Sequence, residues 1–284
     1  MDPVQLALQL KKLKKQNIDH VILEASSHGL KQNRLDGLHF KTGIFTNLSH
    51  DHLDYHKNYS DYLNSKLYLF KKLLNKSSKV IVDKSIPEFK KIKKISKKKK
   101  LNLKTILNNN SSLSLISHRY SGENQIIKIK YKNLIYSFSL KLFGKIQIKN
   151  IFMAMLAAES NNLKFDQIIK KINKIKPVNG RLQKIGKIKN NSMVILDYAH
   201  TPDALNTCLK NLKDQFKDRK ISIVFGCGGN RDKFKRPKMG KIANYYCEKV
   251  YLTDDNPRTE NPKKIRKEIK GKIKKSKILE IPQR

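Results

Sequence analysis

The stretch Val194–Pro202, Val-Ile-Leu-Asp-Tyr-Ala-His-Thr-Pro, holds an acid and an imidazole between a run of apolar residues and the start of a helix. Met193–Leu196 predicts a buried strand, and Thr201-Pro202 predicts a helix with the threonine as its N-cap. The unpaired N–H groups of a first helical turn, together with the helix dipole, attract anions. A phosphate bound there would lie beside Asp197 and His200, although an ordinary strand-to-helix turn has the same residue pattern.

A cluster of imidazole and carboxylate groups follows the predicted strand Thr42–Thr46. Three histidines and two aspartates fall within a short run of a chain that has 8 histidines in all: His50, Asp51, His52, Asp54 and His56. Such groups are metal ligands, and oxygen-rich sites suit Mg²⁺. A single histidine would more often be structural, but this density indicates a functional site. The helix predicted at Ser60–Leu73 contains Lys66, which composition alone gives no reason to single out.

A third polar segment begins with Glu24, at the carboxyl end of a short predicted strand, Val21–Leu23. Ala25–Gly29 follows as a polar turn, at the edge where open α/β sheets bind ligands. Gln32 and Arg34 lie two residues apart and would point the same way in an extended segment. The alternative for Arg34 is a solvated loop charge, and for Glu24 a carboxylate that caps a helix.

Two further strands are predicted in the C-terminal third. Ile221–Phe225 ends in Gly226–Asp232, where glycines let the backbone approach a ligand and Arg231 supplies a cation. Lys249–Thr253 ends in the charged turn Asp254–Arg258. Together with the elbow described first, three consecutive strands would end in charged turns at one edge of a parallel sheet. This convergence indicates a ligand site more strongly than any one turn does.

The remaining pattern predicts an α/β chain of two domains. Apolar periodicity predicts a helix capped by Asp2-Pro3, a strand at Val80–Val82, a hairpin of Ile126–Tyr131 and Leu134–Leu142, and a helix at Asn150–Ala158. Lys90–Lys100 is predicted to be a lysine-rich helix face and loop. Leu101–Asn124, rich in Asn and Ser, is predicted to be an irregular connection. Pro177–Arg181 breaks this pattern, so we place the domains at residues 1–178 and 179–284.

The chain carries 62 Lys and Arg against 23 Asp and Glu, a net charge of +39 over 284 residues. Such an excess is typical of proteins that bind nucleic acid or anionic membranes. Few of the basic residues are arginines, which most often read phosphates and bases through paired hydrogen bonds, and the lysines are spread through every segment. We therefore interpret the charge as a compositional bias, with no nucleic-acid or membrane partner.

The three cysteines, Cys208, Cys227 and Cys247, are widely spaced, with no C-x-x-C pair and no histidine at metal-finger spacing. This pattern predicts reduced thiols and a cytoplasmic protein. The N-terminal residues lack the apolar core of a signal peptide, and no apolar run approaches the roughly 20 residues that span a bilayer.

In order along almost the whole chain, these motifs resemble those of the Mur ligase family. The matching stretches are Glu24–Arg34, Thr46–His56 with Lys66, Pro177–Arg181, Asp197–Leu205, Gly226–Pro237 and Thr253–Pro262. The resemblance is strongest to the members that add the third residue of the peptide. It implies a central nucleotide-binding α/β domain with a mostly parallel sheet, followed by a Rossmann-like C-terminal domain.

The resemblance also implies an ATP-dependent and Mg²⁺-dependent ligase of peptidoglycan precursor synthesis. In such enzymes ATP phosphorylates the terminal carboxylate of UDP-N-acetylmuramoyl-L-alanyl-D-glutamate, and the amine of the incoming amino acid attacks the acyl phosphate. Magnesium and cationic side chains would offset the repulsion between these anions. Arg258 favours meso-diaminopimelate as the incoming amino acid, because its distal carboxylate can form a bidentate pair with arginine, whereas the ammonium of lysine would be repelled.

Individual roles follow from the positions of the matching residues. The resemblance assigns catalysis and metal binding to Glu24, His52 and Lys66, the last as a carbamate; UDP-muramoyl substrate binding to Ser26, Gln32 and Arg34; ATP binding to Arg181, Asp197 and His200; and amino-acid binding to Arg231, Asp255, Asn256, Pro257 and Arg258.

The sequence departs from the family pattern in three respects. No G-x-x-x-x-G-K-[ST] loop for phosphates is present, Gln147 stands where relatives commonly have Asn near the adenine, and the later glycine-glutamate motif of the amino-acid pocket is missing. We therefore expect an N- and C-terminally incomplete enzyme that hydrolyses ATP poorly alone and that a separate chain could complete.

Two other functions stay open from the sequence. A non-catalytic basic protein on the same scaffold would bind DNA or RNA with a steep salt dependence. A related ligase such as folylpolyglutamate synthetase would not be expected to carry the Asp-Asn-Pro-Arg run at residues 255–258.

Overall fold

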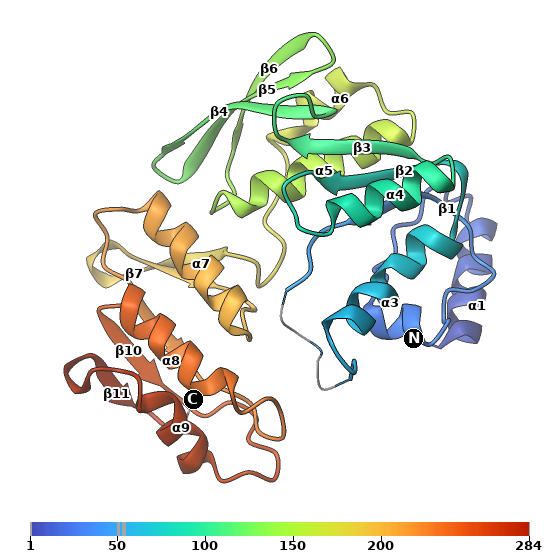
Figure 1. Cartoon of the computed structure of the whole chain (residues 1–284). Coiled ribbons are helices and arrows are strands. Elements are labelled where there is room, and N and C mark those ends of the chain that lie inside the picture. The colour runs from blue at the N-terminus through green and yellow to red at the C-terminus, as the bar shows by residue number, and fades with distance from the viewer. Residues whose placement is uncertain (1, 50–51, 53–54, 284) are drawn as a thin grey trace.

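The computed structural model describes residues 2–49, 52 and 55–283, and these form two lobes (Figure 1). The first lobe is built on a six-stranded sheet, and the second contains a three-stranded and a two-stranded sheet. Within the described ranges, no helix combines the length and the apolar character that a membrane span requires.

The six strands of the first lobe are ordered in the sheet as they are along the chain. The pairs from β1 to β4 are parallel and those from β4 to β6 are antiparallel. The strands are β1 Phe40–Phe45, β2 Leu74–Asp83, β3 Asn102–Leu107, β4 Leu113–Ser121, β5 Asn124–Tyr131 and β6 Leu134–Leu140. The helices are α1 Pro3–Lys15, α2 Ser27–Lys31, α3 Tyr59–Lys72, α4 Phe89–Lys98, α5 Ile146–Ser160 and α6 Phe165–Ile172.

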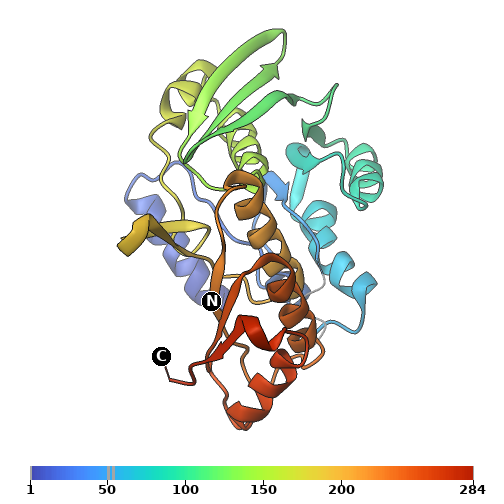
Figure 2. The ribbon, with the colours of Figure 1, turned by 90° about the vertical axis from the view of Figure 1, so that its left-hand side faces the viewer.

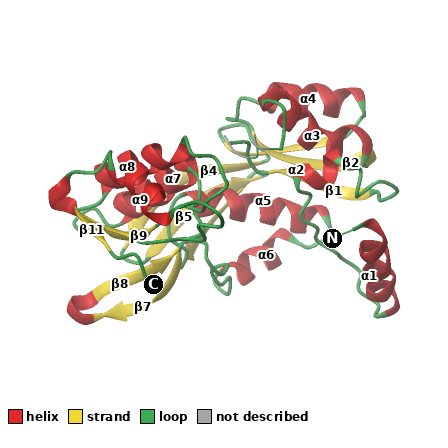
Figure 3. Ribbon diagram, turned by 90° about the horizontal axis from the view of Figure 1, so that it is seen from below, coloured by secondary structure: helices red, strands yellow, loops and turns green. Residues whose placement is uncertain are grey.

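Helices cover both faces of the parallel strands, with α3 and α4 on one side and α5 on the other (Figure 3). Val80 and Val82 of β2 belong to the core cluster that contains Phe70 of α3. Ile81, between them, belongs to the cluster that contains Phe152 of α5. All three β2 side chains are fully buried, as expected of a parallel strand between two helical layers.

The second lobe begins with an antiparallel pair and continues with a parallel α/β unit. The pair consists of β7 Gln183–Ile188 and β8 Ser192–Leu196, separated by the 3-10 turn η1 Lys189–Asn191. The parallel sheet has the order β11-β10-β9, with β9 Ser222–Phe225, β10 Lys249–Leu252 and β11 Ile278–Glu280. Its helices are α7 Pro202–Gln215, α8 Lys235–Tyr246 and α9 Pro262–Lys270, and the 3-10 turn η2 Lys275–Lys277 precedes β11.

Helix α7 lies between the antiparallel strands of the first lobe and the parallel sheet of the second (Figure 1, Figure 2). Gln215 Oε1 accepts a hydrogen bond from Gly144 N at 2.9 Å, and Gln215 Nε2 donates to Gly122 O at 3.2 Å. Asn211 Oδ1 accepts from Ile146 N at 3.1 Å. Two side-chain amides of one helix thus bind backbone groups at two turns of the first lobe.

Apolar and ionic contacts reinforce this junction. Phe143, Leu182 and Leu212 form a buried cluster that draws on both lobes. Lys184 Nζ of β7 binds both carboxylate oxygens of Glu123, at 2.7 and 2.6 Å. The relative position of the lobes is therefore fixed by packing as well as by hydrogen bonds.

Most elements predicted for the first lobe are confirmed. Asp2 caps α1, accepting from Val4 N at 2.9 Å, and α3 buries the predicted apolar face. The segments predicted as a hairpin form β5 and β6, which pair antiparallel, and the lysine-rich segment forms α4 with Ile92 buried. The predicted small-residue helix lies within α5.

The prediction of an irregular connection at Leu101–Asn124 is wrong, because this segment contains β3 and β4. Ile106 and Leu113 are fully buried and pair with each other between these strands. The Asn and Ser residues that suggested a loop are satisfied locally; for example, the Ser114 hydroxyl donates to Asn108 O at 3.0 Å. Composition misled here because these polar side chains bond to nearby backbone.

The predicted strand Val21–Leu23 does not form. An apolar run becomes a strand only when a neighbour supplies ladder hydrogen bonds, and Ile22 is 99% exposed. Gln32 is the C-cap of α2 and Arg34 follows in a turn, so the two are not in an extended segment.

The strand predicted at Met193–Leu196 forms as β8, but it is neither buried nor part of the parallel sheet. It pairs antiparallel with β7, and Leu196 is 52% exposed. Of the three strands expected to end at one edge of one sheet, only β9 and β10 belong to the same sheet. The apolar run identified a strand but carried no information about its partner. The domain boundary between residues 178 and 179 stays a prediction.

Replacing Gly144 with alanine is expected to lower the free energy of unfolding by about 2 to 4 kcal/mol. The residue has φ +82°, and an added Cβ would lie 2.8 Å from Asn211 Cβ and 2.9 Å from Leu182 Cδ1. Urea denaturation measures the change. Gly37→Ala is the matched control, because Gly37 has φ +83° but no atom within 4 Å of the added Cβ. Equal losses in the two variants would show that contact at the junction contributes nothing.

Candidate functional site

A cleft of about 2350 Å³ is lined by residues of both lobes. The predicted site residues that line it are His52 from the first lobe and Asp197, His200, Arg231, Asp255, Asn256 and Arg258 from the second. A pocket for one small ligand usually measures roughly 300 to 1,000 Å³. The cleft is therefore larger than one small ligand usually requires.

The elbow after β8 has the predicted helix start. Thr201 caps α7, its Oγ1 accepting from Ala204 N at 3.3 Å, and Pro202 is the first helical residue. The Asp197 carboxylate accepts from Leu182 N at 2.8 Å and from Ala199 N at 2.9 Å. Asp197 thus fixes the shape of the elbow and also lines the cleft. His200 Nδ1 lies 3.1 Å from the carbonyl of Tyr198, so this nitrogen carries the proton.

Tyr198 is a cleft residue that the sequence analysis did not select. Its side chain is 65% exposed. The Arg181 guanidinium lies 5.0 Å from the centre of its ring, and the His200 ring lies 5.3 Å away on an edge. An exposed aromatic ring beside a guanidinium offers a stacking surface for a planar group. The sequence signal was an aromatic residue inside a polar turn.

In the first lobe, His52 and Lys66 meet at one aromatic ring. The ring centroids of His52 and Tyr62 are 5.8 Å apart, and Lys66 Nζ lies 5.0 Å from the centre of the Tyr62 ring. Lys66 Nζ also donates to Asn47 O at 2.9 Å. His28, which the sequence analysis did not select, lies 5.0 Å from the His52 ring and lines the cleft. The structure therefore brings the predicted imidazole and lysine together.

Glu24 is exposed, and among the described residues no hydrogen bond or ion pair joins it to His52 or Lys66. Of the predicted histidine and aspartate cluster, His50, Asp51 and Asp54 lie outside the described residues. Within the part of the chain that is described, no three His, Cys, Asp or Glu side chains are grouped to hold a metal ion.

The three residues predicted to hold the UDP-linked substrate have structural contacts. Ser26 caps α2, its Oγ accepting from Gly29 N at 3.1 Å. Gln32 Nε2 donates to Tyr55 OH at 2.9 Å, and Arg34 N donates to Gly29 O at 2.9 Å. None of the three is among the described residues that line the cleft.

Two loops of the second lobe carry the predicted amino-acid pocket, and they contact each other directly. Gly229 N donates to Asn256 O at 2.9 Å, and Arg258 Nη1 donates to Gly229 O at 2.6 Å. A Cβ at Gly229 would lie 1.9 Å from Pro257 O. The glycine therefore permits the close approach of one loop to the other; the predicted approach of backbone to a ligand stays a prediction.

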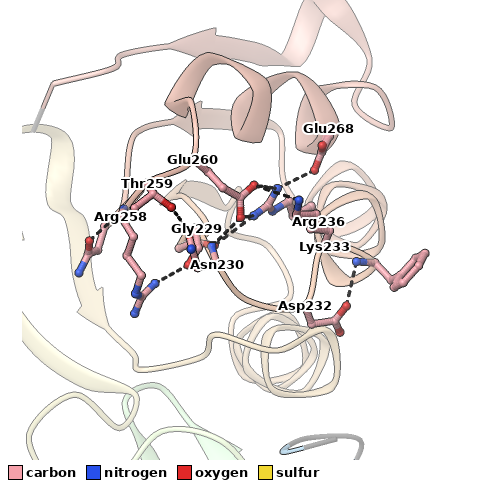
Figure 4. A network of polar contacts seen from close by, with 12 residues as sticks. Gly229, Asn230, Asp232, Lys233, Arg236, Arg258, Thr259, Glu260 and Glu268 are labelled. Atoms are coloured by element: carbon pink, nitrogen blue, oxygen red, sulfur yellow. Dashed lines mark hydrogen bonds and ion pairs between the residues drawn. The ribbon is translucent and has the colours of Figure 1, made fainter. Parts of the chain in front are cut away.

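A buried ion-pair network lies behind these loops (Figure 4). Arg236 of α8 is fully buried; its two terminal nitrogens bind the Glu260 carboxylate at 2.9 and 3.0 Å, and Nη1 also binds Glu268 of α9 at 2.8 Å. Glu260 also accepts from Asn230 N at 2.5 Å. The Arg236 guanidinium, followed by the Asn230 amide, lowers the pKa of Glu260 to about 2.

Cys227 lies in the first of these loops, after Gly226, and its thiol is not a nucleophile at neutral pH. Burial raises its pKa to about 11. The thiolate is the reactive form of cysteine, so the loop offers backbone and cations rather than thiol chemistry.

Glu260→Gln is expected to weaken the dependence of the free energy of unfolding on pH between pH 4.5 and pH 2. The ordinary carboxyl pKa of 4.5 falls to about 2 in the folded chain, so the unfolded chain binds more protons in this window. The stabilisation is complete above pH 4.5 and is lost as the pH falls towards 2. Thermal unfolding at pH 6 and pH 3 compares the two proteins. A Tm that falls equally in both between these pH values would contradict the role of Glu260.

Two family models match the chain. The Mur ligase middle domain matches residues 1–158, and the Mur ligase glutamate ligase domain matches residues 180–284. The chain belongs to the Mur ligase family. The α/β architecture, with a mostly parallel central sheet flanked by helices, agrees with the fold that the sequence predicted.

Among individual relatives, the UDP-N-acetylmuramoyl-L-alanyl-D-glutamate–2,6-diaminopimelate ligase of Rickettsia bellii is 40% identical over 275 residues, which is 96% of this chain and 57% of that protein. The ligase of the same name from Agrobacterium fabrum is 37% identical over 94% of this chain and 55% of that protein. The chain therefore spans somewhat more than half the length of the curated relatives it matches.

Solved structures show the same fold. A 2,6-diaminopimelate ligase of that name superposes with a TM-score of 0.70 at 31% identity, over 100% of this chain and 58% of the other. A folylpolyglutamate synthase from Mycobacterium tuberculosis, complexed with ADP and AMPPCP, gives a TM-score of 0.71 at 16% identity, over 86% of this chain and 54% of the other. Fold similarity alone thus does not separate these ligases, whereas sequence similarity favours the first.

Proposed function

We propose that the chain provides the amino-acid-binding and part of the nucleotide-binding machinery of a ligase of the MurE type, the UDP-N-acetylmuramoyl-tripeptide synthetases. The reaction is the ATP-dependent addition of meso-diaminopimelate to UDP-N-acetylmuramoyl-L-alanyl-D-glutamate. One observation carries the proposal: side chains assigned to metal, nucleotide and amino acid line one cleft, namely His52, Asp197, His200, Arg231 and Arg258. The relatives at 37–40% identity bear the name of this reaction.

The chemistry brings several anions into the cleft, and the wall supplies cations beside them. Arg231 and Arg258 would bind the distal carboxylate of diaminopimelate, since guanidinium groups bind carboxylates in pairs. Arg181 and Tyr198 lie together near the α7 elbow, where they and His200 would contact ATP. Binding of this kind orients the amine towards the acyl phosphate, and orientation supplies much of the rate in such transfers.

We infer that a magnesium ion at this site would be shared between protein and substrate. Mg²⁺ commonly takes one or two carboxylates from protein and the rest of its ligands from water and phosphates. Glu24 and His52 would be its protein ligands, with Lys66 supplying a carboxylate once its amine is carbamylated. The ion would neutralise phosphate charge; Ser26, Gln32 and Arg34 would hold the UDP-linked substrate beyond it.

Arg258→Ala is expected to weaken meso-diaminopimelate binding by roughly 10- to 100-fold, the usual effect of losing a charge-assisted hydrogen bond. Titration calorimetry of the chain with meso-diaminopimelate and with L-lysine measures both affinities. Arg119→Ala removes an exposed arginine on β4 of the first lobe and should leave them unchanged. An undiminished preference for diaminopimelate over lysine in Arg258→Ala would count against the assignment.

Carbamylation of Lys66 can be tested without activity. With ¹³C-labelled bicarbonate, the protein should show a carbamate carbon signal by NMR that Lys66→Arg removes. Lys72→Arg, an exposed lysine on the same helix, is the control and should keep the signal. A spectrum that is identical in all three proteins would exclude this role for Lys66.

The alternative of a basic protein that binds nucleic acid stays a prediction. The residues that line the cleft include three carboxylates, Asp197, Asp232 and Asp255, as well as arginines and lysines. Retention on heparin or DNA at low salt would come from the net charge of +39 and would be lost steeply as salt rises.

A further inference from the structure

The buried ion pair between Arg236 and Glu260 occupies a position that bears on substrate choice. Glu260 lies two residues after Arg258, and it accepts a hydrogen bond from Asn230 N, one residue before Arg231. One carboxylate therefore joins the loop that carries Arg231 to the loop that carries Arg258 (Figure 4).

Arg236 holds the Glu260 carboxylate in place. Its guanidinium is fully buried, binds Glu260 through both terminal nitrogens and binds Glu268 through one of them. The second terminal nitrogen also lies 3.4 Å from Gly228 O. The planar Arg236 guanidinium thus holds the start of α8, the loop after β9 and the segment before α9 together.

The loop that carries Arg258 has an unusual backbone conformation at that residue. Arg258 has φ +50°, in the left-handed region that non-glycine residues rarely adopt. Its backbone N–H donates to Asn256 Oδ1 at 3.3 Å, and its Nη1 binds Gly229 O. Thr259 Oγ1 donates to Asn230 Oδ1 at 3.0 Å. Strained backbone of this kind persists where its surroundings over-determine it, and it clusters at ligand-binding sites.

We propose that Arg236 and Glu260 are positioning residues that set the separation of Arg231 and Arg258, and thereby the preference of the pocket for an amino acid with a distal carboxylate. The inference rests on the proposed function, because it takes Arg231 and Arg258 as the carboxylate-binding groups. Neither Arg236 nor Glu260 needs to touch the substrate. They would affect substrate choice by fixing the relative position of the loop that carries Arg231 and the loop that carries Arg258.

The double variant Arg236→Met with Glu260→Gln tests the proposal without leaving a buried charge unpaired. The matched control is Arg266→Met with Glu280→Gln. Arg266 is also buried and binds two carboxylates, Asp254 and Glu280, but it contacts neither Asn230 nor Glu260 among its described hydrogen bonds. Both variants should lose stability, and only the first should disturb the pocket.

Two readouts are measured on the whole chain. The first is amide hydrogen exchange at Gly229, whose N–H bonds to Asn256 O and to neither mutated side chain; we expect at least a tenfold faster exchange in the test variant. The second is the ratio of the affinities for meso-diaminopimelate and L-lysine, which does not depend on the fraction of chain that is folded. We expect this ratio to fall at least tenfold in the test variant and to stay unchanged in the control.

Unchanged exchange at Gly229 in the test variant would overturn the proposal, as would a wild-type affinity ratio despite faster exchange, or an equal fall of the ratio in the control. Arg236→Lys separates charge from geometry, since an ammonium cannot form the paired contacts of the guanidinium fork. A wild-type ratio in Arg236→Lys would also overturn it. If the wild-type chain binds neither amino acid, the proposed function fails for this chain, and exchange at Gly229 alone still decides whether the pair orders the loops.

Discussion

The side-chain amides of Asn211 and Gln215 are the contacts on which the cleft depends. An amide can accept and donate at once, so Gln215 satisfies Gly144 N and Gly122 O, two backbone groups from different turns of the first lobe. Gly144 lies between β6 and α5 of the first lobe. The turn that begins α5 is therefore also the turn to which α7 of the second lobe binds. His52 and Arg258, from different lobes, line the same cleft, and these hydrogen bonds join the two lobes.

A second constraint is the scarcity of acids. With 23 Asp and Glu against 62 Lys and Arg, few carboxylates are available, and four of them surround two buried arginines: Glu260 and Glu268 around Arg236, and Asp254 and Glu280 around Arg266. Buried ion pairs stabilise a fold only where their geometry is good, and removing one partner is costly. Arg236 joins the loop after β9 to the segment before α9, behind the candidate pocket, whereas Arg266 joins Asp254, after β10, to Glu280 of β11.

Features of the structure were predictable where the residues that determine them lie close together in the sequence. Helix α3 and the β5–β6 hairpin were predictable because their periodicity and turn residues are local. The partner of β8 was not predicted. β7 ends only three residues before β8, but residues 183–188 were not predicted to form a strand, so no hairpin was expected there. Asp197, Arg231 and Arg258 were recognisable beside turn residues, whereas Lys66 needed the family resemblance. Arg236 was missed because its sequence neighbourhood is as basic as the rest of the chain, and only burial distinguishes it.

The apolar side of the cleft has a consequence for the behaviour of the protein in solution. Residues of β8 and β9 both line it, each strand has only one hydrogen-bonded neighbour among the described strands, and Val224 and Leu196 are 69% and 52% exposed. Unpaired strand edges of this kind template the addition of further strands. The charge of +39 keeps copies of the chain apart, and salt screens that repulsion. A higher ionic strength should therefore lower the concentration at which copies of the chain associate through these strand edges.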